Sequence, residues 1–321
     1  MIKVLLLLIL LLAAGYALGW LLPEPTLRLA MALQRRALGL HTRRLYAAGF
    51  DWVYLEGGRG GETVLLVHGF GASKDNWLLF AYRLRRNYRV LIPDLPGFGD
   101  SSRDPAAMFD VIAQTERLHA FVETLGLERF HLVGNSMGGH IAALYAAHHP
   151  EQVLSLALFA NAGIDSPRKS ELIAALEASA GRDNRLLLQS PEDFQRFKDF
   201  LFVRAPYMPR LLQRGYIHQL LREREYQRRM FQFMINGYVA LEPLLPEIKA
   251  PTLILWGDSD RVLDVSSVEV MRPLLRHSQV VIMQHCGHVP MLERPAETAR
   301  HYLAFLAAQR VTDESELPAP G

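Results

Sequence analysis

The sequence contains very little cysteine and almost no excess charge. Cys286 is the only cysteine among 321 residues, so an intramolecular disulfide is excluded and the fold must depend on a hydrophobic core. The formal net charge is +2, which argues against nucleic acid as a partner. No H-E-x-x-H pair is present, and the glycine-rich segment 57–61 lacks the lysine of a phosphate-binding loop. We therefore expect no metal and no cofactor, and we interpret segment 57–61 as a hairpin turn.

Charge is also missing from the nineteen residues between Val4 and Leu22. A helix of this length nearly crosses a hydrocarbon core of about 30 Å, whereas the apolar part of a signal peptide usually spans about 7 to 15 residues. We predict that residues 1–24 form a transmembrane anchor. A cleaved signal sequence is the alternative, because Ala17 and Gly19 have the spacing of small residues that precedes a cleavage site.

Residues 25–48 are predicted to form a basic amphipathic helix on the membrane surface. At about 100° per residue, Arg28, Arg35, Arg36 and Arg43 fall on one side of such a helix, and apolar residues fall on the other. Membrane lipids are then partners, unless the apolar stripe packs on the protein itself. The excess of arginine after the apolar run predicts a bacterial inner-membrane protein whose main domain faces the cytoplasm. A periplasmic or secreted location after signal cleavage is the alternative.

Residues 134–138 have the pattern G-x-S-x-G, between an apolar strand-like run and a helix-forming run. A serine in a sharp turn between a strand and a helix is exposed for attack, and Gly134 and Gly138 remove side chains that would clash there. A flexible glycine loop is the alternative interpretation. The flanking strand and helix favour a nucleophile, which we assign to Ser136.

A serine nucleophile requires a histidine that takes its proton and a carboxylate that orients the histidine. Asp258 and Asp260 follow the apolar run 252–256. His285 and His288 likewise follow an apolar run. Each candidate thus lies just past a predicted strand, where parallel sheets carry their sites. The spacing alone leaves the choice within each pair open.

The order Ser, Asp, His and the loops that carry these residues resemble the α/β-hydrolase superfamily over about residues 50–308. The resemblance implies that Asp260 is the orienting acid, since it completes the G-x-x-D pattern that begins at Gly257. It also implies that His288, which follows a glycine, is the general base.

An upstream segment, residues 68–71 (His-Gly-Phe-Gly), resembles the oxyanion loop of the same superfamily. Acyl transfer develops negative charge on the carbonyl oxygen, and preorganised backbone N–H groups stabilise that charge. The resemblance implies that these donors are the backbone N–H groups of Phe70 and Met137. Residues 94–101 match the superfamily's D-x-P-G-x-G-x-S loop, which we expect to shape the site rather than to react.

The expected fold class is α/β, an α/β-hydrolase fold with a mostly parallel twisted sheet and helices on both faces. Residues 49–163 and 248–310 are predicted to form this core, and residues 164–247 a helical cap rich in aromatic residues and methionine. Residues 311–321 are predicted as a disordered tail. Strands are expected at residues 50–55, 63–67, 88–92, 130–134, 153–159, 252–256 and 279–284.

Within the superfamily, the sequence looks most like membrane-associated monoacylglycerol lipases and related bacterial esterases. The resemblance implies a serine hydrolase that cleaves carboxylic esters of lipophilic substrates through an acyl-enzyme on Ser136. A carbon–carbon bond hydrolase of dienoic ring-fission products is an alternative, since such enzymes share the sequence of residues 134–139. An acyltransferase with the same triad and an inactive binding module are further alternatives. The sequence leaves the oligomeric state open.

Overall fold

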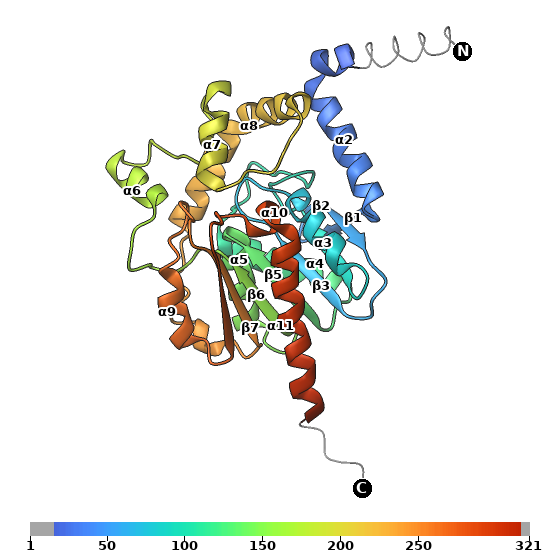
Figure 1. Ribbon diagram of the computed structural model, residues 1–321, viewed down its shortest axis with the longest axis vertical. Helices are drawn as coiled ribbons and strands as arrows, with labels where there is room; N and C mark the ends of the chain where they lie inside the picture. Colours follow the sequence, from blue (N-terminus) through green and yellow to red (C-terminus); the bar gives the residue numbers. More distant parts are fainter. Residues whose placement is uncertain (1–15, 316–321) are drawn as a thin grey trace, which may run out of the picture.

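The computed structural model describes residues 16–315 (Figure 1). The predicted anchor or signal sequence, residues 1–24, lies for most of its length outside this range. Within residues 16–315, no helix is both long enough and apolar enough to cross a membrane. The last helix continues to Ser315 and so enters the segment 311–321 that was predicted as a disordered tail.

An eight-stranded sheet, in the order β1-β2-β4-β3-β5-β6-β7-β8, forms the centre of the molecule. The strands from β4 to β8 in this order are parallel, whereas β1 and β2 run antiparallel to their neighbours. The seven predicted strands are all present, within two residues of their expected ends. In chain order the strands are β1 (Leu40–Ala47), β2 (Phe50–Gly57), β3 (Thr63–Val67), β4 (Arg89–Pro93), β5 (Phe130–Asn135), β6 (Val153–Phe159), β7 (Thr252–Gly257) and β8 (Ser278–Met283).

The predicted helix over residues 25–48 is wrong beyond Ala37. Helix α2 (Pro23–Ala37) is followed by Gly39, whose φ of 70° is the left-handed conformation that closes many helices. Strand β1 then forms a hairpin with β2, and Ala48 and Gly49 have positive φ in the two-residue turn. Pairing with β2 stabilises an extended chain here and overrides the helical periodicity of the sequence.

The hairpin turn predicted at residues 57–61 is also wrong, because β4 lies between β2 and β3 in the sheet. The segment instead passes against the start of β4. A Cβ on Gly58 would lie 2.0 Å from Tyr88 O, and one on Gly60 would lie 1.9 Å from Asn87 O. Glycine is therefore required by a close approach of two backbones rather than by a hairpin.

Helices cover both faces of the sheet and form two hydrophobic cores. Along β3, Leu65 and Val67 face the core under α4, α5 and α9, whereas Val64 and Leu66 face the core under α3, α10 and α11. These helices are α3 (Leu78–Leu84), α4 (Val111–Thr124), α5 (Met137–His148), α9 (Ser267–Leu274), α10 (Pro290–Glu293) and α11 (Pro295–Ser315).

Between β6 and β7 the chain forms helices and no strand. This segment contains α6 (Glu171–Ala178), α7 (Phe194–Leu201) and the long α8 (Arg210–Asn236), with single 3-10 turns at Pro191–Asp193 and Leu245–Glu247. In Figure 1 the three helices lie on the upper side of the molecule, above one end of the sheet. They occupy the segment for which the sequence predicted a helical cap.

Helix α2 packs against α8 of this insertion. A Cβ on Gly215 would lie 2.4 Å from Pro23 O and 2.9 Å from Leu27 Cβ, so glycine allows the two helices to approach closely. Leu27 is buried, and Arg222 of α8 forms an ion pair with Glu24. One face of α2 thus packs on the protein itself, which was the alternative to a helix on the membrane surface.

Candidate active site

Ser136 lies in a sharp turn between β5 and α5, with a φ of 57°. Its backbone N–H donates to Phe159 O at 3.0 Å. A Cβ on Gly134 would lie 2.2 Å from Gly138 O, and one on Gly138 would lie 2.4 Å from His68 O. Glycine at both positions lets the first turn of α5 approach the strands, which holds a non-glycine residue in a strained conformation at the tip.

His288 and Asp260 come together at the ends of β8 and β7. The Nδ1 of His288 lies 2.8 Å from Asp260 Oδ2, and both side chains are buried. The other oxygen of Asp260 accepts the backbone N–H groups of Val262 at 2.8 Å and Leu263 at 3.0 Å. These bonds fix the carboxylate, and the contact at Nδ1 leaves Nε2 of His288 as the ring nitrogen available for proton transfer.

Asp258 and His285 are not paired in this way. The Oδ1 of Asp258 accepts from Ser259 Oγ at 2.8 Å and from the backbone N–H of Cys286 at 3.4 Å, so Asp258 orders the turn after β7. His285 is exposed, with a φ of 52°. Of the two candidate pairs, the structure joins Asp260 to His288, as the resemblance implied.

Ser136 and His288 line one cavity of about 80 Å³, which we name the Ser136 cavity. The loop after β3 contributes Gly69 and Phe70. A second cavity of about 420 Å³ is lined by residues of α2, α7 and α8 and shares lining residues with the first. Six apolar residues of the inserted segment form much of the wall of the Ser136 cavity: Leu186, Leu187, Leu188, Phe197, Leu201 and Leu220.

The loop after β3 brings its backbone next to Ser136. A Cβ on Gly69 would lie 3.0 Å from Ser136 Cβ, and Phe70 lines the same cavity. Met137 is the first residue of α5, so its backbone N–H is among the donors that have no partner within the helix. The two predicted oxyanion donors therefore lie on the segments that flank the Ser136 side chain.

Buried His68 joins this loop to the loop after β4. Its Nδ1 lies 2.8 Å from Gly69 O, and the backbone N–H of Leu95 donates to its Nε2 at 3.0 Å. This pattern requires a neutral ring with the proton on Nδ1. Burial lowers the pKa of His68, which favours the same neutral form. His68 therefore holds the two loops together as a neutral hydrogen-bonding group.

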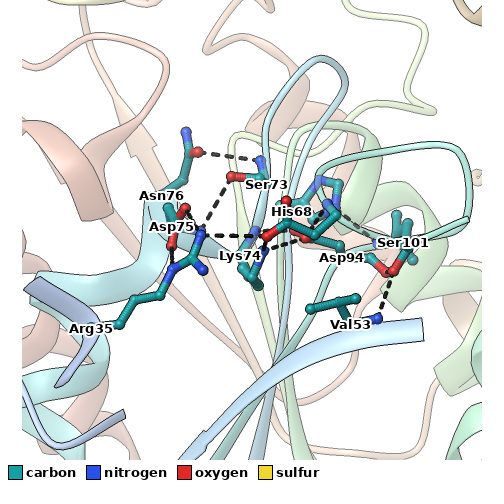
Figure 2. A network of polar contacts seen from close by, with 11 residues as sticks. Arg35, Val53, His68, Ser73, Lys74, Asp75, Asn76, Asp94 and Ser101 are labelled. Carbon is teal, nitrogen blue, oxygen red and sulfur yellow. Dashed lines mark hydrogen bonds and ion pairs between the residues drawn. The ribbon is translucent and has the colours of Figure 1, made fainter. Parts of the chain in front are cut away.

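A buried ion pair lies beside these loops, shown in Figure 2. Lys74 is in a 3-10 turn after β3 (Lys74–Trp77), and its side chain is 1% exposed, whereas that of Asp94, after β4, is 0% exposed. Lys74 Nζ lies 2.5 Å from Asp94 Oδ2 and 2.7 Å from Asp100 Oδ2. The backbone N–H of Lys74 also donates to Asp94 Oδ1 at 2.7 Å. Asp94 thus binds both the backbone and the side chain of the same lysine.

Hydrogen bonds extend this cluster to β2 and to α2 (Figure 2). Ser101 Oγ donates to Asp94 O at 2.7 Å and accepts the backbone N–H of Val53 at 2.9 Å. Arg35 of α2 donates from Nε to Asp75 Oδ1 at 2.7 Å. The cluster therefore connects the N-terminal helix, an antiparallel strand and the loops after β3 and β4.

The charges of the cluster stabilise one another. Burial alone lowers the pKa of Lys74, but the carboxylates of Asp94, Asp75 and Asp100 outweigh it and raise that pKa above its usual value. Burial raises the pKa of Asp100, and the ammonium of Lys74 outweighs it, so the pKa of Asp100 is lowered. Both shifts favour the charged forms, so Lys74 and Asp100 stay ionised at neutral pH.

Sequence reasoning missed the buried pairing of Lys74 with Asp94 and the contact of Arg35 with Asp75. Residues 94–101 were expected to shape the site. Within this segment the carboxylate of Asp94 binds Lys74 and so connects the segments that follow β3 and β4. The partners of Asp94 and Asp75 lie 20 and 40 residues away along the chain. No local pattern signals such pairs, because the pairing exists only once the sheet has brought β3 and β4 together.

Within residues 16–315, no three His, Cys, Asp or Glu side chains are grouped so that they could hold a metal ion. The thiol of Cys286 is buried, and burial raises its pKa to about 12. Cys286 therefore remains a protonated thiol, which is a weak nucleophile.

The family profile described as the alpha/beta hydrolase fold matches residues 62–295. The chain belongs to this family. The matched residues include most of the sheet, the turn at Ser136 and the loops that follow β7 and β8.

Curated relatives of the chain include lipases. Lipase 1 of Psychrobacter immobilis is 37% identical over 270 residues, which are 82% of this chain and 84% of the relative. The monoacylglycerol lipase ABHD6 of Mus musculus is 32% identical over 305 residues, 92% of this chain and 91% of the relative. A solved structure of a membrane phospholipase A, described as a bacterial virulence factor, is 51% identical with a TM-score of 0.88, and the match covers 97% of this chain and 99% of that one.

We predict that Asp94→Asn strongly destabilises the fold. The substitution leaves the Lys74 ammonium buried without its main counter-charge, and breaking a buried ion pair costs about 3–5 kcal/mol of unfolding free energy. Urea denaturation measures the loss. The control is Glu177→Gln, which breaks the exposed pair with Lys169 and should cost no more than about 1 kcal/mol. Equal, small losses in both variants would contradict a structural role for the buried pair.

Proposed function

We propose that the chain is a serine hydrolase that cleaves carboxylic esters of lipophilic substrates, such as monoacylglycerols. The observation that carries this proposal is the pairing of His288 with Asp260 beside Ser136, with Ser136 and His288 in one cavity. A strained serine, an oriented histidine and a fixed carboxylate are the three groups that nucleophilic acyl transfer requires.

In the proposed mechanism His288 takes the proton of the Ser136 hydroxyl as its oxygen attacks the ester carbonyl. The backbone N–H groups of Phe70 and Met137 stabilise the negative charge on the carbonyl oxygen. When the tetrahedral intermediate collapses, His288 donates the proton to the leaving alcohol and an acyl-enzyme remains. The same histidine then activates a water molecule, which releases the carboxylic acid and restores the serine. Asp260 holds the imidazole in the required tautomer throughout.

The lining of the Ser136 cavity supports a lipophilic acyl group. The space next to the serine is lined by three consecutive leucines, Leu186 to Leu188. It is also lined by apolar side chains of α7 and α8. Burial of an alkyl chain against such side chains is favourable by about 0.8 kcal/mol per methylene group. The lipase and monoacylglycerol lipase relatives named above support the same class of substrate.

A panel of substrates tests the reaction. In detergent micelles, 1-monoacylglycerols should release fatty acid, and Ser136→Ala should lower kcat/KM by at least about 10⁴-fold because the nucleophile is removed. Ser166→Ala, which changes a serine outside the cavity, is the matched control and should keep full activity. The panel includes a dienoic ring-fission substrate and an added alcohol as acyl acceptor.

The other outcomes of this panel separate the alternatives. Rapid turnover of the dienoate with ester turnover near background would assign the chain to the carbon–carbon bond hydrolases. Transfer of the acyl group to the added alcohol in preference to water would assign it to the acyltransferases. Ester hydrolysis that survives in Ser136→Ala would overturn the proposed nucleophile.

We also propose that the protein associates with a membrane through its N-terminal region. On the face of α2 that turns away from α8, Leu29 and Leu33 are 62% and 60% exposed, next to exposed Arg28 and Arg36. Apolar and basic side chains together suit the surface of an anionic bilayer. The apolar sequence that precedes α2 supports an anchor, and the excess of arginine after it supports a cytoplasmic orientation at a bacterial inner membrane.

Flotation with anionic vesicles tests this association. We expect the whole chain to float with the vesicles, and a chain that begins at residue 16 to float less but detectably. Leu29→Ser combined with Leu33→Ser in the shorter chain should abolish its flotation, since the exposed apolar face is lost. A whole chain that stays in the dense fraction would contradict the proposal. Protection from protease added to intact spheroplasts would support the cytoplasmic orientation, and degradation would favour the periplasmic one.

A further inference from the structure

One stripe of helix α8 faces the Ser136 cavity. Tyr216, Leu220, Arg224 and Gln227 all line the cavity and are spaced by four, four and three residues. This spacing places them on one side of a helix. The stripe changes character along its length, from aromatic and aliphatic at Tyr216 and Leu220 to polar at Arg224 and Gln227.

Gln227 is buried, and the oxygen of its side-chain amide has no hydrogen-bond partner within residues 16–315. Gln227 is 7% exposed, and the atom without a partner is Oε1 of its side chain. Of the buried polar atoms without a partner in this part of the chain, Oε1 of Gln227 is the one whose residue lines the Ser136 cavity. A buried amide without a partner is destabilising, so a native example requires an explanation.

The position of Gln227 explains why its amide oxygen lacks a partner within the protein. Its Oε1 lies 3.9 Å from where a Cβ on Gly71 would be, so the amide is next to the loop that carries Phe70. One turn further along α8, the ring of Phe231 packs on that of Phe70 with centroids 5.3 Å apart. The neighbouring Arg224 already donates to Gln189 O at 3.1 Å. Of the residues in the stripe, Gln227 is therefore the one with a buried polar atom that lacks a partner, and it lies beside the loop proposed to hold the oxyanion.

An ester held at Ser136 has two different substituents on its carbonyl carbon. The leucine-rich wall and Leu220 suit the acyl chain, which leaves the polar end of the stripe for the alcohol part. A hydroxyl group both donates and accepts a hydrogen bond, so it can pair with either end of a carboxamide.

We propose that the carboxamide of Gln227 hydrogen-bonds a hydroxyl group on the alcohol part of the substrate. Gln227 is then a specificity-determining residue that selects fatty-acid esters of polyols, such as glycerol, over esters of simple alkanols. This inference rests on the proposed ester hydrolysis. Sites built to bind a hydroxyl group discriminate against analogues that lack it, because the polar group of the site is then left unpaired.

The test compares two substrates that differ only in hydroxyl groups. They are the 1-glyceryl ester and the propyl ester of the same fatty acid, presented in the same mixed micelles. The wild-type protein should prefer the glyceryl ester by about 10-fold or more in kcat/KM, and Gln227→Met should lose this preference. Activity of Gln227→Met on the propyl ester should equal or exceed that of wild type, because the substitution removes the polar group that this ester leaves unpaired. Gln232→Met, an identical change at an exposed position of the same helix, should leave both activities unchanged.

Each other outcome overturns the proposal. A wild-type protein with no preference for the glyceryl ester contradicts it without any variant, so the test does not depend on the folding of Gln227→Met. An equal loss on both substrates in Gln227→Met assigns Gln227 a structural role, and an unchanged preference in that variant removes Gln227 from recognition. Absence of Ser136-dependent turnover of either ester is the separate failure of the proposed function.

Discussion

The close approach of backbones around Ser136 is the constraint on which the rest of the site depends. A side chain at Gly134 would overlap Gly138 O, and one at Gly138 would overlap His68 O. Because both positions are glycine, the first turn of α5 lies directly against the ends of β5 and β3. This contact fixes Ser136 in its strained conformation and at the same time sets the distance to the loop that carries Phe70. The nucleophile and the loop of the proposed oxyanion site are therefore positioned by a single contact.

Apolar side chains pack the helices on both faces of the sheet. At the edge of the sheet near Ser136, a buried ion pair connects the segments that follow β3 and β4. The segments after β3 and β4 bury Trp77, Leu95 and Phe98, and the Lys74–Asp94 pair joins the two segments in addition. Such a pair adds little net stability over a hydrophobic contact, yet it fixes one geometry, because leaving either charge alone would be costly. Through Asp75 and Arg35 the same cluster reaches α2, so the N-terminal helix is tied to the loop beside Ser136.

The parts of the structure that the sequence predicted are those with local signals. The seven expected strands are apolar runs bounded by turn residues, and the G-x-S-x-G pattern marks the turn at Ser136 by the space that its glycines create. Strand β1 could not be predicted in the same way, because residues 40–47 have helical periodicity and become extended only by pairing with β2. The pairing of Lys74 with Asp94 and the place of Gln227 beside the Ser136 cavity were missed for a related reason. Their roles come from partners and cavities that exist only in the folded chain.

In the proposed mechanism Ser136 carries the acyl group during turnover. Rapid acid quenching of the wild-type protein with a 4-nitrophenyl fatty-acid ester, followed by peptide mass spectrometry, tests it most directly. We expect a burst of nitrophenol and one acylated peptide, with the added mass on Ser136. Turnover of the ester without any acylated peptide, or acylation of a different residue, would contradict it.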